Sequence, residues 1–223
     1  MQPESADPIN SAHRLLIVIP RHAQTLLAAL EEASHREKKL PAWRSQQILN
    51  FINAIRIYSE DLTDRYKNHR IDALAQTVRN LTEVCIWTQY CNLSEQHAKT
   101  FYEDCVRDMR EMMEAVSALY TSANGKPEER LVSMIDGLRA VAAQSRFQDF
   151  DDGYKRVYDA AKEIGRLDAF KAMYKVGSKL AHPTSMSLNL SEGLVKLLDC
   201  QYVGGEKLAS ACLAEIEKQI KRG

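Results

Sequence analysis

The sequence has no excess of positive charge. It contains 30 lysines and arginines against 30 aspartates and glutamates in 223 residues, so its formal net charge is zero. Proteins that bind nucleic acid over a broad surface usually carry a basic excess. The balance therefore excludes a general nucleic-acid binder, and any contact with RNA must come from a local group of side chains.

Long apolar runs are also missing. The most apolar early stretch, from Leu15 to Ile19, ends at Pro20 and is far too short to span a bilayer. The first eight residues are polar and include Glu4 and Asp7, which is the wrong charge for the start of a signal peptide. We therefore expect a cytoplasmic protein that makes no membrane contact.

Cysteines are few and irregularly spaced. There are five, an odd number, and no pair has the two-residue spacing of a zinc knuckle or a redox motif. We expect free thiols in a reducing compartment. Cys85, Cys105 and Cys212 lie in apolar helical runs and are expected to be buried. The histidines show no metal-ligand spacing, so we predict no metal and no cofactor.

Glycine is scarce as well, and no long stretch alternates apolar and polar residues. Only nine glycines occur, and apolar residues recur at helical spacing throughout the chain. We predict an all-α protein that forms a single-domain antiparallel helical bundle, because the connections between helices are short. The expected helices cover about 10–39, 41–67, 71–90, 94–122, 128–144, 154–164, 167–181 and a last segment after 193.

The expected organisation has three parts: a flexible N-terminal tail over 1–9, an N-terminal helical hairpin over 10–69, and a helical core over 70–223. Asn10 or Ser11 is expected to cap the first helix, and Ser94 to cap the fourth. Charged residues outside the apolar stripes are interpreted as solvated, ion-paired faces. They include Arg44 in the second helix and, in the fourth, Glu103, Asp104, Arg107, Asp108, Arg110, Glu111 and Glu114.

The helix expected over 71–90 is apolar around most of its circumference, which is typical of a central, buried helix. Arg79 and Glu83 nevertheless lie on it, four residues apart and therefore on one side. Buried charge is costly unless it is paired. The pair is either a plain intrahelical ion pair at the rim of the core or the lining of a polar pocket that positions a substrate group.

A second group of polar residues lies on one face of the helix expected over 167–181. Tyr174, Ser178 and His182 follow one another at a spacing of four. His182 stands just before Pro183, at the helix end, where it could move protons near neutral pH while the hydroxyls orient a substrate. Alternatively, the imidazolium only satisfies the helix C-terminus and Tyr174 is an ordinary core residue.

Together these segments resemble a bacterial family of unknown function that is related to the HEPN superfamily (higher eukaryotes and prokaryotes nucleotide-binding). The run Arg79-Asn-Leu-Thr-Glu83 is similar to that family's Arg–Leu–Glu signature. The run Tyr174-Lys-Val-Gly-Ser178-Lys-Leu-Ala-His182 is similar to its Tyr–Ser–His signature. The resemblance covers roughly residues 70–190 and implies a helical bundle with a HEPN-like core that is often a homodimer.

Many HEPN relatives are metal-independent ribonucleases of toxin–antitoxin, defence and stress systems, in which a histidine moves protons and an arginine stabilises the scissile phosphate. The resemblance therefore implies His182 as the acid/base group and RNA or a nucleotide as the substrate. It also implies an antitoxin-like protein partner. In this sequence lysines rather than an arginine precede His182. We expect Lys175 and Lys179 to bind phosphate, with Arg79 as the guanidinium from a neighbouring helix.

Two hypotheses follow for the function. In the first, a HEPN-like domain acts on RNA or a nucleotide, with Glu83, Tyr174 and Ser178 orienting the groups that bind and react. In the second, the chain is a non-catalytic binding or dimerisation module whose polar cluster is structural. The convergence of several polar residue types favours the first hypothesis, and the neutral net charge favours the second.

Overall fold

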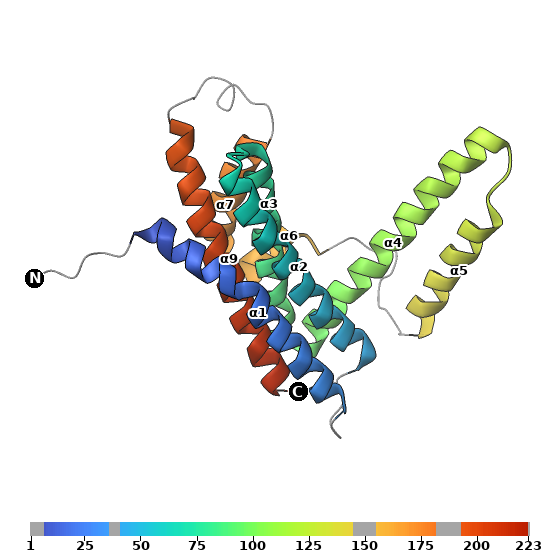
Figure 1. Cartoon of the computed structure of the whole chain (residues 1–223). Helices are drawn as coiled ribbons and strands as arrows, with labels where there is room; N and C mark the ends of the chain where they lie inside the picture. Colours follow the sequence, from blue (N-terminus) through green and yellow to red (C-terminus); the bar gives the residue numbers. More distant parts are fainter. Residues whose placement is uncertain (1–6, 36–40, 145–154, 182–192, 223) are drawn as a thin grey trace, which may run out of the picture. The chain divides into compact units, whose positions relative to one another are not determined.

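The computed structural model describes residues 7–35, 41–144, 155–181 and 193–222. Over these residues the chain forms eight helices and no strand, as the sequence predicts (Figure 1). The helices are α1 (Pro8–His35), α2 (Ala42–Lys67), α3 (Ile71–Cys91), α4 (Glu95–Asn124), α5 (Glu129–Gln144), α6 (Val157–Glu163), α7 (Leu167–Ala181) and α9 (Gly193–Arg222). Among them, none combines the length and the apolar character needed to cross a bilayer.

The helices fall into two compact units. The larger unit comprises Met1–Asn92 and Val157–Gly223, and therefore holds α1, α2, α3, α6, α7 and α9. The hairpin unit comprises Leu93–Arg156 and holds α4 and α5. The division proposed from the sequence, into a hairpin over 10–69 and a core over 70–223, stays a prediction.

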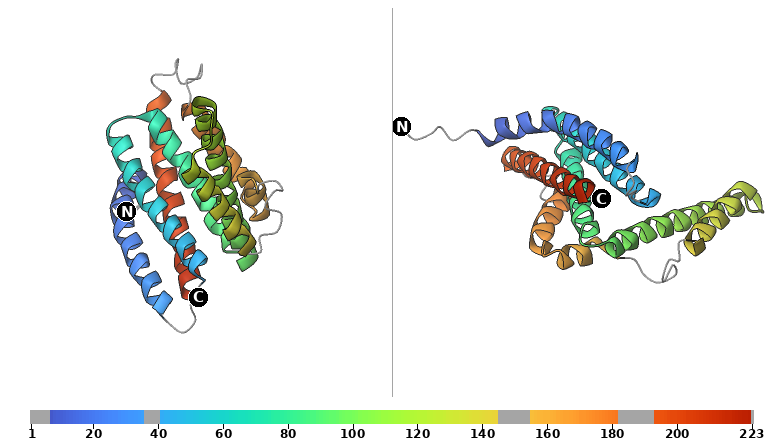
Figure 2. Two further views of the ribbon diagram at one scale, coloured as in Figure 1. Left: turned by 90° about the vertical axis from the view of Figure 1, so that its right-hand side faces the viewer. Right: turned by 90° about the horizontal axis from the view of Figure 1, so that it is seen from below.

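Helix α3 is the centre of the larger unit. It packs against α2, α6, α7 and α9, and the two views of Figure 2 show it among these helices. Its buried positions include Leu74, Val78 and Leu81, each 1% exposed or less. Removing a side chain of this size from water contributes about 1.5–3 kcal/mol. The predicted central role of this segment is therefore confirmed.

Helix α1 packs against α2 and α9 and begins earlier than predicted. The carboxylate of Asp7 accepts a hydrogen bond from the backbone N–H of Ile9 at 3.0 Å, so Asp7 caps the helix in place of Asn10 or Ser11. Pro8 then occupies the first helical position, where a missing N–H costs nothing. The helix continues through Pro20 to His35.

Helix α2 buries an apolar stripe, but Arg44, one residue of its expected solvated face, does not lie in solvent as predicted. Ile48, Ile52 and Ile55 are fully buried. Arg44, however, turns inward and donates hydrogen bonds to the carbonyl of Cys91 at 2.9 Å and to Gln219 at 3.0 Å. The interpretation of Arg44 as a solvated charge is therefore wrong, because this guanidinium joins α2 to the C-terminal ends of α3 and α9.

The link between α6 and α7 turns at Gly165. Gly165 has a φ of 69°, in the left-handed region that glycine enters without strain. Its N–H binds the carbonyl of Lys162, and the N–H of Arg166 binds the carbonyl of Ala161. This pair of bonds ends α6 and places Arg166 directly before α7.

The hairpin unit begins with the predicted cap, since the Ser94 hydroxyl accepts the N–H of His97 at 3.3 Å. Two other expectations for α4 are wrong. Cys105 is exposed rather than buried. Glu103, Asp104 and Arg107 are buried rather than solvated, and Asp104 pairs with Arg107 and with the backbone N–H of Lys155.

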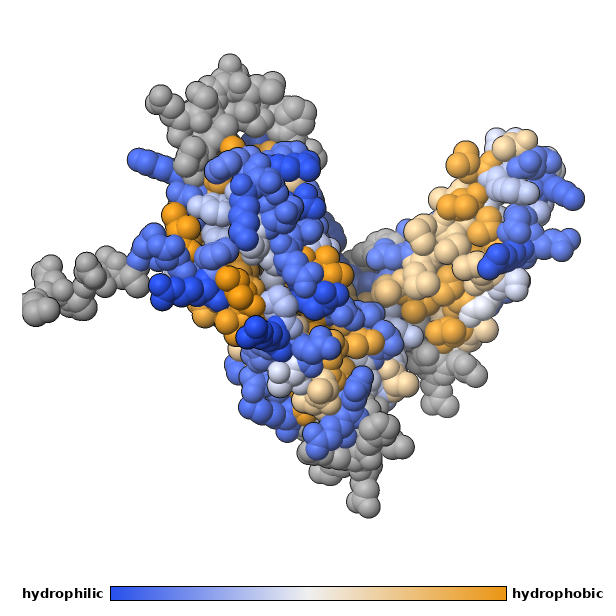
Figure 3. Space-filling view, viewed as in Figure 1, coloured by the Kyte–Doolittle hydropathy of each residue, from blue (hydrophilic) through white to orange (hydrophobic). Residues whose placement is uncertain are grey.

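Apolar side chains also remain on the surface of the hairpin unit (Figure 3). The exposed ones include Met109, Met112, Val116, Leu119, Val132 and Met134. They follow both α4 and α5, because two helices alone offer each other only one packed seam.

Candidate functional site

The candidate site is built where α7 crosses α3 in the larger unit. Gly177 of α7 is buried at this crossing. A Cβ atom at Gly177 would lie 3.3 Å from the carbonyl oxygen of Ala75 and 3.3 Å from the Cβ of Arg79. The absence of a side chain at Gly177 therefore lets the two helices approach closely, and it brings the turn of α7 that carries Tyr174 beside Arg79.

Arg79 and Tyr174 meet across this crossing, although 95 positions separate them in the sequence. The Arg79 guanidinium donates a hydrogen bond to the Tyr174 hydroxyl. Its central carbon also lies 4.1 Å from the centre of the Tyr174 ring, within the range of a cation–π contact. The ring in turn contacts Phe170, with 5.1 Å between ring centres, so the tyrosine has a neighbour on its own helix as well as one on α3.

Glu83 completes the cluster from α3. Its carboxylate lies 3.6 Å from Nε of Arg79, one helical turn away, as the spacing predicts. The side chains of Arg79 and Glu83 are 23% and 35% exposed, respectively. The pair therefore lies at the rim of the core, where water screens its attraction but a ligand can reach it.

The remaining predicted site residues lie on or just beyond α7. Ser178 is half-buried, one turn after Tyr174. Lys175 and Lys179 are exposed on the same helix. His182 follows the last residue of α7 and lies outside the described residues, as do 183–192. The structure thus brings Arg79, Glu83 and Tyr174 together, and it does not describe the imidazole.

A cavity of about 250 Å³ lies between α3, α7 and α9, next to this cluster. Phe170 lines it and also contacts Tyr174, so the cavity and the cluster share a wall. The other lining residues from α3 are Thr82, Cys85, Ile86 and Gln89, and Arg166 stands beside them. The sequence did not indicate this cavity, because its walls come from helices far apart along the chain.

A second polar group, also missed from the sequence, joins α1, α2 and α9. The Tyr66 hydroxyl donates to Asp199 at 2.8 Å, and its ring stacks on Tyr202 with 4.0 Å between centres. Tyr202 is fully buried and its hydroxyl lies 3.0 Å from Nδ1 of His13. Burial raises the pKa of Tyr66 to about 12, and the hydrogen bond to Asp199 adds to the rise.

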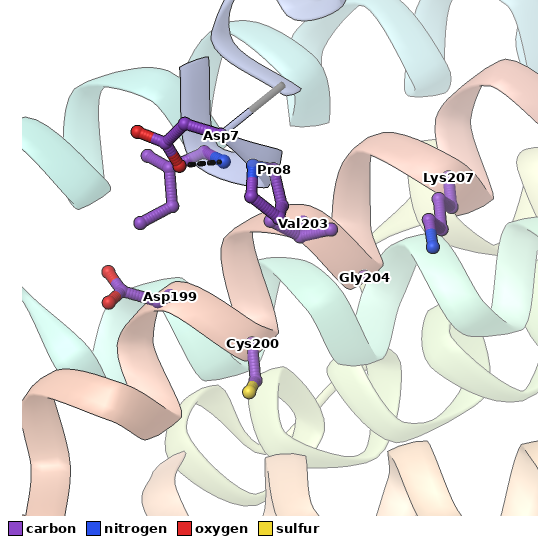
Figure 4. Close-up of a pocket in the computed structure, with 8 residues that line it drawn as sticks. Asp7, Pro8, Asp199, Cys200, Val203, Gly204 and Lys207 are labelled. Atoms are coloured by element: carbon purple, nitrogen blue, oxygen red, sulfur yellow. Dashed lines mark hydrogen bonds between the residues drawn. The ribbon is translucent and has the colours of Figure 1, made fainter. Parts of the chain in front are cut away.

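Asp199 also borders a pocket of about 430 Å³ between the start of α1 and α9 (Figure 4). Asp7 and Pro8 line one side of the pocket, and Val203 and Lys207 of α9 line the other. Asp7 is exposed and Asp199 is half-buried, and both carboxylates already accept hydrogen bonds, Asp7 as the cap of α1 and Asp199 from Tyr66. The two carboxylates of this pocket therefore have structural roles.

The fold and the site define a class: an all-helical protein in which the arginine of an arginine–glutamate pair on α3 is bound by a tyrosine of α7. A family model described as a family of unknown function, DUF5677, matches residues 48–193, and the chain belongs to that family. The matched region contains Arg79, Glu83, Tyr174 and Ser178. Comparison with curated proteins and with solved structures gave no match.

Proposed function

We propose that this protein is a HEPN-like helical protein that acts on RNA or a nucleotide, with Arg79 as the group that binds phosphate. The observation that supports the proposal is the contact of Arg79 with Tyr174 across the crossing of α3 and α7. A guanidinium held by a phenol and a carboxylate has a fixed orientation. Fixed orientation is what the recognition of a phosphate by an arginine requires.

The charge around Arg79 supports phosphate as the ligand. A guanidinium has more N–H donors than one hydroxyl and one carboxylate can use, so donors remain for phosphate oxygens. Lys175 and Lys179 place two further cations on exposed positions of α7. These positive charges are local, which agrees with a chain of zero net charge that binds RNA at one site.

In the proposed reaction His182 is the acid/base group. The imidazole accepts the proton of a ribose 2′-hydroxyl, whose oxygen attacks the neighbouring phosphorus. The bond to the 5′-oxygen breaks, that oxygen takes the proton from the imidazolium, and a 2′,3′-cyclic phosphate is left on the other fragment. Arg79 stabilises the negative charge that develops on the phosphate, and Tyr174 and Glu83 hold the guanidinium in place. The reaction needs no metal ion, because the cations of the chain supply the positive charge.

The proposed setting follows the resemblance to HEPN proteins. The protein would act in the cytoplasm as a ribonuclease of a defence or toxin–antitoxin system, restrained by an antitoxin-like partner. A homodimer would complete the cleft around His182 from a second copy. Analytical ultracentrifugation of the full chain tests the dimer directly.

Incubation of labelled single-stranded RNA with the purified chain tests the reaction. The wild type should shorten the RNA, His182→Ala should abolish cleavage, and Arg79→Ala should slow it roughly 100-fold, as the loss of a charge-stabilising donor does elsewhere. Arg56→Ala is the matched control, because Arg56 forms an ion pair of the same spacing with Glu60 on α2. Equal RNA survival with the wild type, the His182 variant and buffer would rule out the nuclease.

A second candidate function is a non-catalytic binding or dimerisation module. It is favoured by the fact that Arg79 is already engaged by both Tyr174 and Glu83. Under this alternative, Tyr174→Phe lowers the melting temperature and leaves RNA binding unchanged. Under the first proposal, the same change reduces RNA affinity or cleavage by more than any loss of folded protein explains, since the phenol orients the guanidinium.

A further inference from the structure

Two of the buried cysteines lie against each other inside the larger unit. Cys85 of α3 and Cys212 of α9 are 3% and 0% exposed, and they are close enough for each thiol to shift the pKa of the other. They come from positions that are far apart in the sequence, so the packing of α3 on α9 brings them together. Cys91, the other buried thiol, lies instead beside Arg44 near the end of α3.

The two thiols differ in access. Cys85 lines the cavity of about 250 Å³ between α3, α7 and α9, whereas Cys212 is not among the lining residues. A water molecule takes up about 30 Å³ of liquid, so the cavity has room for several molecules of that size. A small neutral reagent in the cavity can therefore reach Cys85 but has no direct contact with Cys212.

The polar surroundings of Cys85 favour its thiolate. Gln89 donates a hydrogen bond to the Cys85 sulfur at 3.1 Å, and Arg166 lies 3.5 Å from the oxygen of Gln89. The neighbouring Cys212 thiol lowers the pKa of Cys85 most, burial opposes it, and Gln89 and Arg166 lower it further. By contrast, burial raises the pKa of Cys91 to about 12. The thiolate is the nucleophilic form, so Cys85 is the more reactive buried thiol.

We propose that Cys85 is a peroxide-reactive site and that Cys212 resolves its oxidised form into a disulfide between α3 and α9. The proposal rests on the paired thiols, the cavity beside Cys85 and the Arg166–Gln89 contact. It is independent of the RNA chemistry proposed above. A hydroperoxide is the class of oxidant that the site would take, because it is small enough for the cavity and attacked by a thiolate.

The reaction balances in two steps. The Cys85 thiolate attacks one oxygen of hydrogen peroxide, the O–O bond breaks, and the released hydroxide takes up the proton that the Cys85 thiol gave up, which yields one water and leaves Cys85 as a sulfenic acid. The Cys212 thiol then gives its proton to the sulfenic oxygen, and its sulfur attacks the Cys85 sulfur. The S–O bond breaks, the disulfide forms, and the oxygen leaves as a second water. The thiol pair loses two electrons, which the peroxide gains.

The first test uses the wild-type chain and no substitution. The protein is treated with hydrogen peroxide, remaining thiols are alkylated in denaturant, and peptides are identified by mass spectrometry. We expect loss of free Cys85 at least about tenfold faster than of Cys91, with one disulfide that joins Cys85 to Cys212. Oxidation of Cys85 no faster than of Cys91, or Cys85 joined to exposed Cys105 or Cys200 instead, would overturn the proposal.

Variants then separate the two roles. In Cys212→Ser the sulfenic acid at Cys85 should persist and be captured by dimedone, whereas in Cys85→Ser the disulfide and the captured product should both disappear. Cys91→Ser is the matched control and should behave as the wild type. A Cys212→Ser protein that shows no dimedone adduct at Cys85 would also contradict the proposal. Circular dichroism of each variant shows whether the fold is kept.

Discussion

The close crossing of α3 and α7 makes a sharp prediction for Gly177→Ala. An added Cβ would lie 3.3 Å from the carbonyl oxygen of Ala75 and 3.3 Å from the Cβ of Arg79. Neither contact can relax by a side-chain rotation, because both atoms are fixed by the backbone of α3. Overpacking of this kind costs about 1–3 kcal/mol. Alanine also favours a helix over glycine by about 1 kcal/mol, which acts in the opposite direction.

The expected net result is a loss of about 1 kcal/mol in the free energy of unfolding. The reverse substitution at an exposed site of the same helix, Ala172→Gly, measures the propensity contribution alone and should also cost about 1 kcal/mol. Urea unfolding followed by circular dichroism measures both variants. If Gly177→Ala is instead more stable than the wild type by the amount that Ala172→Gly loses, the two helices are not in close contact.

Three further predictions concern the supports of the larger unit, each measured by urea unfolding. Arg44→Ala should lose about 2 kcal/mol by removing the donor of the Gln219 side-chain oxygen and of the Cys91 carbonyl, whereas Arg56→Ala, which removes a surface ion pair, should lose under about 1 kcal/mol. Gly165→Ala should cost about 1–2 kcal/mol, since its φ of 69° is strained for alanine, and an unchanged midpoint would contradict that turn. Folding raises the pKa of Tyr66 to about 12, so its neutral phenol stabilises the fold fully below pH 10, and this contribution is lost as the pH rises toward 12. Two pKa units correspond to ~2.7 kcal/mol, and solvent screening of this partly exposed ring reduces that figure to about 1 kcal/mol. Between about pH 9 and about pH 12, the free energy of unfolding of Tyr66→Phe should therefore fall by about 1 kcal/mol less than that of the wild type.

Much of the architecture could be predicted because apolar periodicity depends on single helices. The stripe of α3 and the helix bounds around it follow from residues three and four apart, and so does the pairing of Arg79 with Glu83. The glycine stop at Gly165 and the cap at Ser94 are likewise local features. Local patterns therefore predicted the fold class and two of the three residues of the candidate cluster, Arg79 and Glu83.

What could not be predicted depends on which helices cross, and where. Gly177 looks like any helical glycine until α3 is placed against it. No residue near Arg44 in the sequence indicates its acceptors, because the ends of α3 and α9 provide them. The pairing of Cys85 with Cys212 likewise arises from packing between distant segments, and no spacing along one helix indicates it.

The affinity of the chain for RNA tests the central claim most directly. Fluorescence anisotropy of a labelled single-stranded oligonucleotide, at fixed salt, gives the Kd of the wild type, Arg79→Ala and Arg56→Ala. We predict that the Arg79 variant binds roughly tenfold more weakly, equal to about 1.4 kcal/mol, and that the Arg56 variant binds as the wild type does. Equal affinity for all three proteins, or no binding by the wild type, would contradict a phosphate site at the crossing of α3 and α7.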